Sequence, residues 1–142
     1  GATGCVESLA AGWSIVRDLR AAGFDVSTTR DAMELVRAGT PEAVNLLRAA
    51  GRTLGRAIAY AVSLLNPDIV VVGGSLTGQH LLTGVRESVY SYSPPLATND
   101  LRVVEGRGDA RSGATGAALR AVARTLRPDE VNGRLRFLAE PA

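Results

Sequence analysis

The sequence predicts an α/β fold that is rich in helices and has a small parallel sheet, and three features indicate it. The β-branched run from Ile69 to Val72 ends in two glycines and is typical of a strand covered on both faces. A second strand is expected around Leu101 to Val104. Apolar residues at helical spacing precede, separate and follow the two strands. This order predicts a right-handed parallel crossover and layers of helices on a sheet.

Two helices are expected at the beginning of the chain. The first is indicated by apolar residues at helical spacing, namely Val6, Leu9, Ala10, Trp13, Val16 and Leu19. Gly23 lies where this helix should end. The second helix follows a short connection, with Thr29 as the expected cap and Gly39 as the expected terminator.

A long third helix is expected from Thr40-Pro41 to Asn66. Threonine can cap a helix, and proline is tolerated at the first helical position. Gly51 and Gly55 lie four residues apart inside this helix. Because glycine weakens a helix, we expect a neighbouring element to pack closely against these two positions.

The remaining elements complete the predicted layers. A helix between the strands has the inner face Leu81, Leu82, Val85 and Val89. The closing helix is expected over residues 110–126, with Gly113 and Gly116 small enough to pack against the sheet. We expect residues 128–142 to be an extended or loose tail. The predicted organisation is therefore a domain over residues 1–127 and a tail over residues 128–142.

Composition excludes several classes of function. The 142 residues include 46% hydrophobic residues, enough for one buried core. All 16 basic residues are arginine and are balanced by 14 acids, and their even distribution is typical of solvated helix faces, not of a nucleic-acid interface. No apolar stretch approaches the roughly 20 residues of a membrane span. The single cysteine excludes an internal disulfide, and we expect a cytoplasmic protein.

The chain is expected to be part of a longer protein. It has no initiator methionine, and it opens directly on a glycine-rich motif. Two strands make a sheet that is marginal alone, so we expect a parent chain to supply further strands. Exposed strand edges and apolar faces also favour a homo-oligomer.

Two segments contain residues that can do chemistry. In the first, Cys5 can become a thiolate ligand and Glu7 can accept hydrogen bonds from adjacent hydroxyls. Alone, Cys5 is equally a small buried thiol, and Glu7 an acid favoured at a helix start. The second segment is Gly73-Gly74-Ser75, which follows a predicted strand where open α/β sheets bind ligands. It is equally a tight turn. No residue at a suitable spacing could complete a catalytic triad or a metal site with His80. This favours an ordinary surface histidine.

These segments resemble the ROK family (repressor, open reading frame, kinase). Gly1, Gly4, Cys5 and Glu7 match the second half of the family signature, and the asparagine-proline before the first strand with its double glycine matches a second family segment. The proline-leucine-alanine loop near residue 95 is more similar to the regulators of the family than to its kinases. The resemblance implies the carboxyl-terminal lobe of an actin-like, ribonuclease H-like ATPase fold.

The resemblance also implies roles for site residues. Cys5 would be a zinc ligand in the parent, Glu7 would contact a sugar or sugar phosphate, and Gly73, Gly74 and Ser75 would line a nucleotide cleft. One cysteine cannot make a structural zinc site, so no cofactor is expected in this chain alone.

Three functions remain open from the sequence. The first is the effector and dimerisation portion of a sugar-responsive transcriptional regulator, which contacts DNA only through an upstream domain. The second is the carboxyl-terminal lobe of a sugar kinase that uses ATP and magnesium. The third is an interaction module. No activity is expected for this chain by itself, because the family's catalytic aspartate and phosphate loop precede this region.

Overall fold

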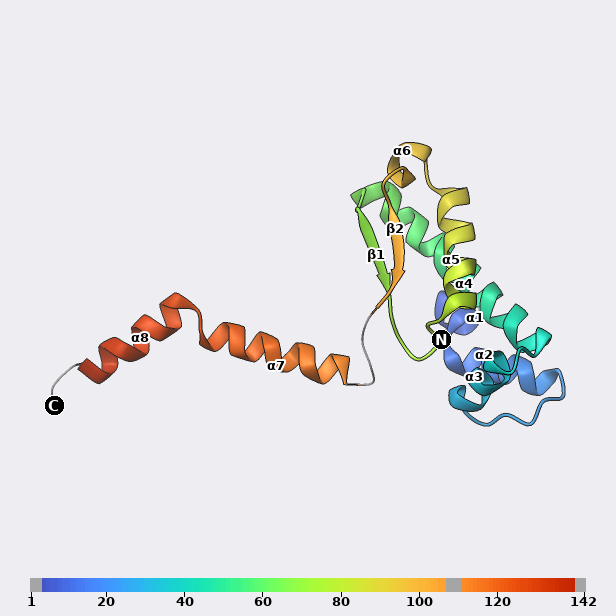
Figure 1. The fold of residues 1–142 in the computed structure, drawn as a ribbon, viewed down its shortest axis with the longest axis horizontal. Helices are drawn as coiled ribbons and strands as arrows, with labels where there is room; N and C mark the ends of the chain where they lie inside the picture. The colour runs from blue at the N-terminus through green and yellow to red at the C-terminus, as the bar shows by residue number, and fades with distance from the viewer. Residues whose placement is uncertain (1–3, 107–110, 140–142) are drawn as a thin grey trace. The chain divides into compact units, whose positions relative to one another are not determined.

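The computed structural model describes residues 4–106 and 111–139, with side chains described as far as Gly133. These residues form two compact units, Gly1–Arg107 and Gly108–Ala142 (Figure 1). We call them unit 1 and unit 2 and describe each by itself. The sequence-predicted division after residue 127 stays a prediction.

The first expected helix is two helices, so the prediction of one continuous helix is wrong. Helix α1 spans Val6–Ala10 and helix α2 spans Gly12–Ala21. Ala11 between them has extended backbone, and the Ser14 hydroxyl donates to its carbonyl at 2.7 Å. Trp13, in the first turn of α2, is 49% exposed.

Helix α3, Thr29–Arg37, is capped by Thr28, one residue before the expected Thr29. The Thr28 hydroxyl accepts from the N–H of Asp31, and the Asp31 carboxylate accepts from the N–H of Thr28, which makes a reciprocal capping box. The helix ends at Arg37, and Gly39, just after the C-cap residue Ala38, has a φ of 76° that favours glycine, so the predicted terminator is confirmed.

Helix α4, Pro41–Leu65, is the expected long helix, and Asn66 ends it in the left-handed conformation. Helix α5, Gln79–Tyr92, packs along it. A Cβ at Gly51 would collide with the carbonyl of Leu81, and one at Gly55 would lie 2.6 Å from the carbonyl of Val85. The expected close neighbour is therefore α5, and the fully buried Leu47, Val62, Val85 and Val89 form the core between the helices.

Strands β1, Ile69–Val72, and β2, Arg102–Glu105, form the predicted parallel pair, with Val72 opposite Glu105. Helix α5 connects them and lies against β2 (Figure 1). Val71 is 60% exposed in unit 1, so unit 1 alone does not cover both faces of β1, and the prediction that both faces are covered stays a prediction. Apolar content shows that a strand can be buried but not what covers it. A short helix not predicted from the sequence, α6, Pro95–Thr98, precedes β2.

Unit 2 consists of helix α7, Ser112–Thr125, and helix α8, Pro128–Ala139. The closing helix is confirmed within the described residues, and its packing against the sheet stays a prediction. The expected loose tail is wrong over α8, where proline at the first position and the acids Asp129 and Glu130 favour a helix start. Over the part of the chain that the structure describes, no helix combines the length and the apolar character needed to cross a membrane.

Candidate functional site

Cys5 and Glu7 lie at the start of α1. Cys5 is the N-cap residue and is partly buried, and the Ser8 hydroxyl donates to its carbonyl at 2.8 Å. The N–H of Ser8, and then its hydroxyl, lower the pKa of the Cys5 thiol. A lowered pKa favours the thiolate, which is the form that reacts and binds metals.

The described residues do not supply the further ligands that Cys5 would need for a structural zinc site. It is the only cysteine in the sequence. Among the described residues, no group of three histidine, cysteine, aspartate or glutamate side chains is placed to hold a metal ion. A closed tetrahedral zinc site takes four such ligands. The donor set therefore does not fit zinc here, and a zinc site in the parent stays a prediction.

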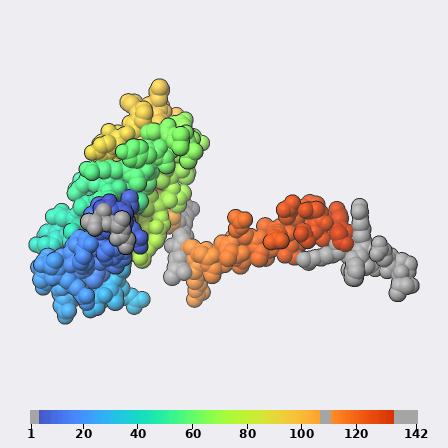
Figure 2. Space-filling model, turned by 180° about the vertical axis from the view of Figure 1, so that it is seen from behind, coloured from blue at the N-terminus to red at the C-terminus, as the bar shows by residue number. Residues whose placement is uncertain are grey.

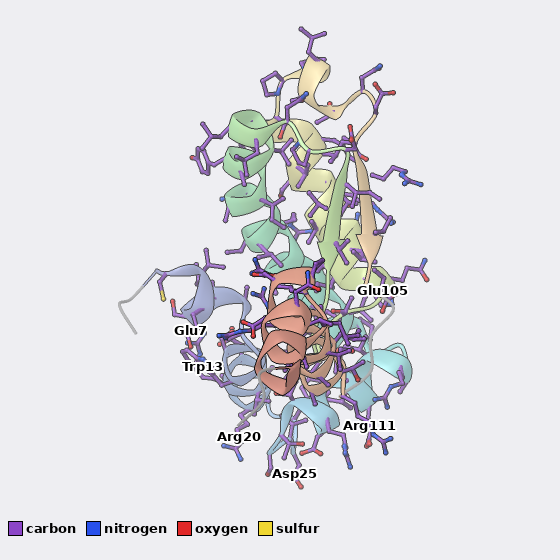
Figure 3. The ribbon with its side chains drawn as sticks, turned by 90° about the vertical axis from the view of Figure 1, so that its left-hand side faces the viewer. Glu7, Trp13, Arg20, Asp25, Glu105 and Arg111 are labelled. Atoms are coloured by element: carbon purple, nitrogen blue, oxygen red, sulfur yellow. The ribbon has the colours of Figure 1, made fainter. Side chains whose placement is uncertain are left out.

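Glu7 presents a carboxylate to solvent from the first turn of α1. Figure 3 shows it on the same side of the molecule as Trp13. Its carbonyl accepts from the N–H of Ala11 at 3.1 Å, which closes the short helix. An exposed carboxylate held on one turn of helix can accept two hydrogen bonds from neighbouring hydroxyls.

The glycine pair ends β1 and starts an exposed loop. Gly74 has a φ of 122°, a conformation that side chains rarely adopt, and its carbonyl accepts from the N–H of Thr77 at 3.2 Å. The N–H of Gly106, after β2, donates to the carbonyl of Val72 at 2.8 Å. Gly73 therefore leads into a turn over Gly74–Thr77 at the carboxyl edge of the sheet, where a ligand could approach the backbone.

Glu7 and the glycine loop belong to different elements of unit 1, α1 and the end of β1. Gly73 follows Val72, which pairs with Glu105, so the glycine loop lies at the Glu105 end of the sheet. Figure 3 shows Glu7 and Glu105 on opposite sides of the view. The predicted roles of Glu7 as a sugar contact and of the glycine loop as part of a nucleotide cleft stay predictions.

Sequence reasoning missed a cleft between α2 and the start of α3. Trp13, Arg17 and Arg20 line it from α2, and residues 27–29 line it from the other side. The signal was the spacing of the three α2 residues, which share one side of a helix. Trp13 was instead counted among the apolar residues of a single first helix, because the break at Ala11 was not foreseen.

Comparison with known proteins gives one family. The model of the ROK family matches residues 1–124. Transcriptional regulators of Mycobacterium bovis and Mycobacterium tuberculosis are each 35% identical over 82 residues, which is 57% of this chain and 19% of theirs. The chain thus spans about a fifth of the length of these curated relatives.

Two solved structures share the fold. A ROK family transcriptional regulator, a homolog of the E. coli MLC protein, is 28% identical with a TM-score of 0.73, over 84% of this chain and 33% of the other. A ROK hexokinase from Thermus thermophilus is 30% identical with a TM-score of 0.63, over 84% of this chain and 41% of the other. The fold is therefore that of the actin-like ATPases, as the sequence predicted.

Proposed function

Because the chain belongs to the ROK family, we propose that it is the sugar-responsive effector and dimerisation portion of a transcriptional regulator. The likeness to regulators in both sequence and fold supports this choice over other members of the family. The parent would contact DNA through a domain upstream of this chain and would work in the cytoplasm.

In this proposal Glu7 is the contact through which the parent detects its sugar. Its exposed carboxylate accepts hydrogen bonds from neighbouring sugar hydroxyls, while residues of the parent outside this chain complete the cleft. A sugar can change DNA binding only if it prefers one arrangement of the two lobes. Such a switch therefore places Glu7 in a cleft whose shape differs between the two arrangements.

Dimerisation is supported by an exposed apolar surface at one end of unit 1. We call it the α4–α6 surface and define it by Arg56, Tyr60, Leu64, Tyr92 and Leu96. Leu64 is 83% and Leu96 is 92% exposed. Figure 2 shows the end of α4 and α6 at the same end of the unit. Tyrosine and arginine are enriched at the centres of protein interfaces, and exposed apolar patches mark interaction sites. A second copy of the chain is the proposed occupant.

A sugar kinase is the second candidate, favoured by the likeness to a ROK hexokinase. In that case Gly73, Gly74 and Ser75 would let backbone approach a nucleotide. ATP and magnesium would supply the phosphoryl group and neutralise its charge, while the catalytic base would come from outside this chain.

The experiment uses the parent protein, produced from the complete gene. Its operator complex should dissociate when the inducing sugar is added, and Glu7→Gln should weaken that response about tenfold while operator affinity without sugar stays unchanged. Glu34→Gln, a change at an exposed acid on α3, is the matched control. Sugar-dependent ATP turnover without operator binding would instead identify the kinase, and an unaltered sugar response in Glu7→Gln would remove Glu7 from the site.

A further inference from the structure

We propose that the cleft between α2 and α3 binds a small phosphate ester, at a site separate from Glu7 and from the glycine loop. The cleft has a volume of about 520 Å³. Its polar lining comes from the guanidinium groups of Arg17 and Arg20 and from three hydroxyl side chains on the opposite wall, those of Ser27, Thr28 and Thr29. The proposal goes beyond the function above and does not depend on it.

The cleft is a consequence of local sequence. Trp13, Arg17 and Arg20 are spaced by four and three residues, so they share one side of α2. Figure 3 shows Trp13 and Arg20 on the same side of the molecule. A Cβ at Gly12 would collide with the Thr29 hydroxyl, so glycine lets the two walls approach closely at one end.

Both guanidinium groups are held in place with donors to spare. The Nε of Arg20 donates to the carbonyl of Val26 at 2.6 Å, and one terminal nitrogen donates to the Ser27 hydroxyl at 3.3 Å. The Nε of Arg17 donates to Asp18 at 2.7 Å, and its guanidinium lies 5.4 Å from the centre of the Trp13 ring. Each guanidinium has five N–H donors in a fixed fork, so each keeps donors for a ligand.

Two carboxylates oppose an anion here, and their placement limits their effect. Asp18 pairs with Arg17, and Asp31 accepts from the N–H groups of Ser27 and Thr28 at 2.8 Å each. Neither acid belongs to the lining of the cleft. Asp18 offsets the charge of Arg17, which leaves the Arg20 guanidinium, the remaining N–H donors of Arg17 and the hydroxyl donors to suit the oxygens of a phosphate group.

The size and the apolar part of the cleft favour an ester over a free phosphate ion. Its volume falls within the range of about 300 to 1,000 Å³ that is usual for small-molecule sites. Trp13 is half exposed, and Val16 lines the cleft beside it. The arginines can bind a phosphate group, and the indole can pack against an organic ring. The class of ligand that fits is therefore a phosphorylated sugar or nucleoside.

Trp13 provides a direct measurement, because it is the only tryptophan in the chain. The 142-residue chain would be titrated with glucose 6-phosphate, inorganic phosphate and glucose at low ionic strength while its fluorescence is recorded. We expect a saturable change with glucose 6-phosphate, at least about tenfold weaker binding of inorganic phosphate, and no change with glucose. Added salt should weaken binding, because the charges are exposed to solvent.

Variants identify the residues responsible. Arg17→Gln should weaken the binding of glucose 6-phosphate about tenfold or more. Arg17→Lys should recover only part of that lost affinity, because lysine cannot donate two parallel hydrogen bonds as a guanidinium does. Arg37→Gln removes an exposed arginine at the far end of α3 and should leave binding unchanged. The proposal would be overturned by equal responses to glucose and glucose 6-phosphate, or by the absence of any saturable response. It would also be overturned if inorganic phosphate bound as tightly as glucose 6-phosphate, or if Arg17→Gln and Arg37→Gln lost the same affinity.

Discussion

The Asp31 carboxylate shows how a single exposed residue orders the start of a helix. It accepts hydrogen bonds from the N–H groups of Ser27 and Thr28, and these, the Ser27 contact first, hold its pKa below the ordinary 3.8. Because the pKa is lowered in the folded chain, the stabilisation is present above about pH 4 and is lost as the pH falls through the lowered value. The start of α3 should therefore loosen in acid.

The test is a comparison of Asp31→Asn with the unchanged chain between pH 2 and pH 7. Protection of the Ser27 and Thr28 amides, measured as exchange relative to the intrinsic rate at each pH, should fall in acid in the unchanged chain. In Asp31→Asn this protection should be low at every pH. Asp25→Asn, in the preceding exposed connection, is the control. Identical pH profiles for Asp31→Asn and the unchanged chain would contradict the assigned role.

Residue-level prediction from sequence depended on whether the signal was local. Gly39 ends α3 as expected because a left-handed residue favours glycine whatever surrounds it. Thr28 and Thr29 are both good caps, and the sequence alone favoured the wrong one. The Asp31 side chain decides between them, because it is three residues after Thr28 and completes a capping box only with that residue.

At the scale of elements, the crossing of α4 and α5 depends on glycines. A Cβ at Gly84 would collide with the carbonyl of Arg48, which is backbone and cannot rotate away. Gly84→Ala should therefore destabilise the chain by about 1 to 3 kcal/mol, although alanine is the better helix former by roughly 1 kcal/mol. Urea unfolding measures the difference, and the pairing of Arg48 and Arg52 with Glu87 reports the same crossing.

Ser91→Ala is the control for this substitution. Ser91 is exposed on the same helix, so its change should stay within about 0.5 kcal/mol of the unchanged chain. A stabilised Gly84→Ala variant would show that helix propensity outweighs the close approach and that α4 and α5 are farther apart than described.

Element prediction succeeded where a pattern was long and failed at short interruptions. The series from Thr40 to Asn66 gives α4 because many turns share one apolar face. One extended residue at Ala11 was enough to divide the first helix, and no periodicity over a dozen residues detects a break of that size. The cleft beside Trp13 follows from this break, so the same failure concealed a candidate site.

At the scale of the molecule, the sequence predicted the parallel pair, the long helix and the family, because each rests on residues inside the chain. The cover of β1 and a zinc site at Cys5 stay predictions, because the described residues of unit 1 supply neither. Glu7 and the glycine loop were identified as motifs, and the structure places them on α1 and at the end of β1.

The α4–α6 surface predicts how copies of the chain associate. Leu64 is 83% exposed and lies one helical turn after Tyr60. Arg56 lies one turn before Tyr60, and its guanidinium is 5.4 Å from the centre of the Tyr92 ring. Burying Leu64 against a second copy is favourable by about 1.5 to 3 kcal/mol, and a glutamate there would place a charge in the interface. Leu64→Glu should therefore weaken self-association of the purified chain at least tenfold, as measured by analytical ultracentrifugation. Leu9→Glu adds the same charge at another exposed leucine, on α1, and should leave association unchanged, whereas an unchanged dimer in Leu64→Glu would place the interface elsewhere.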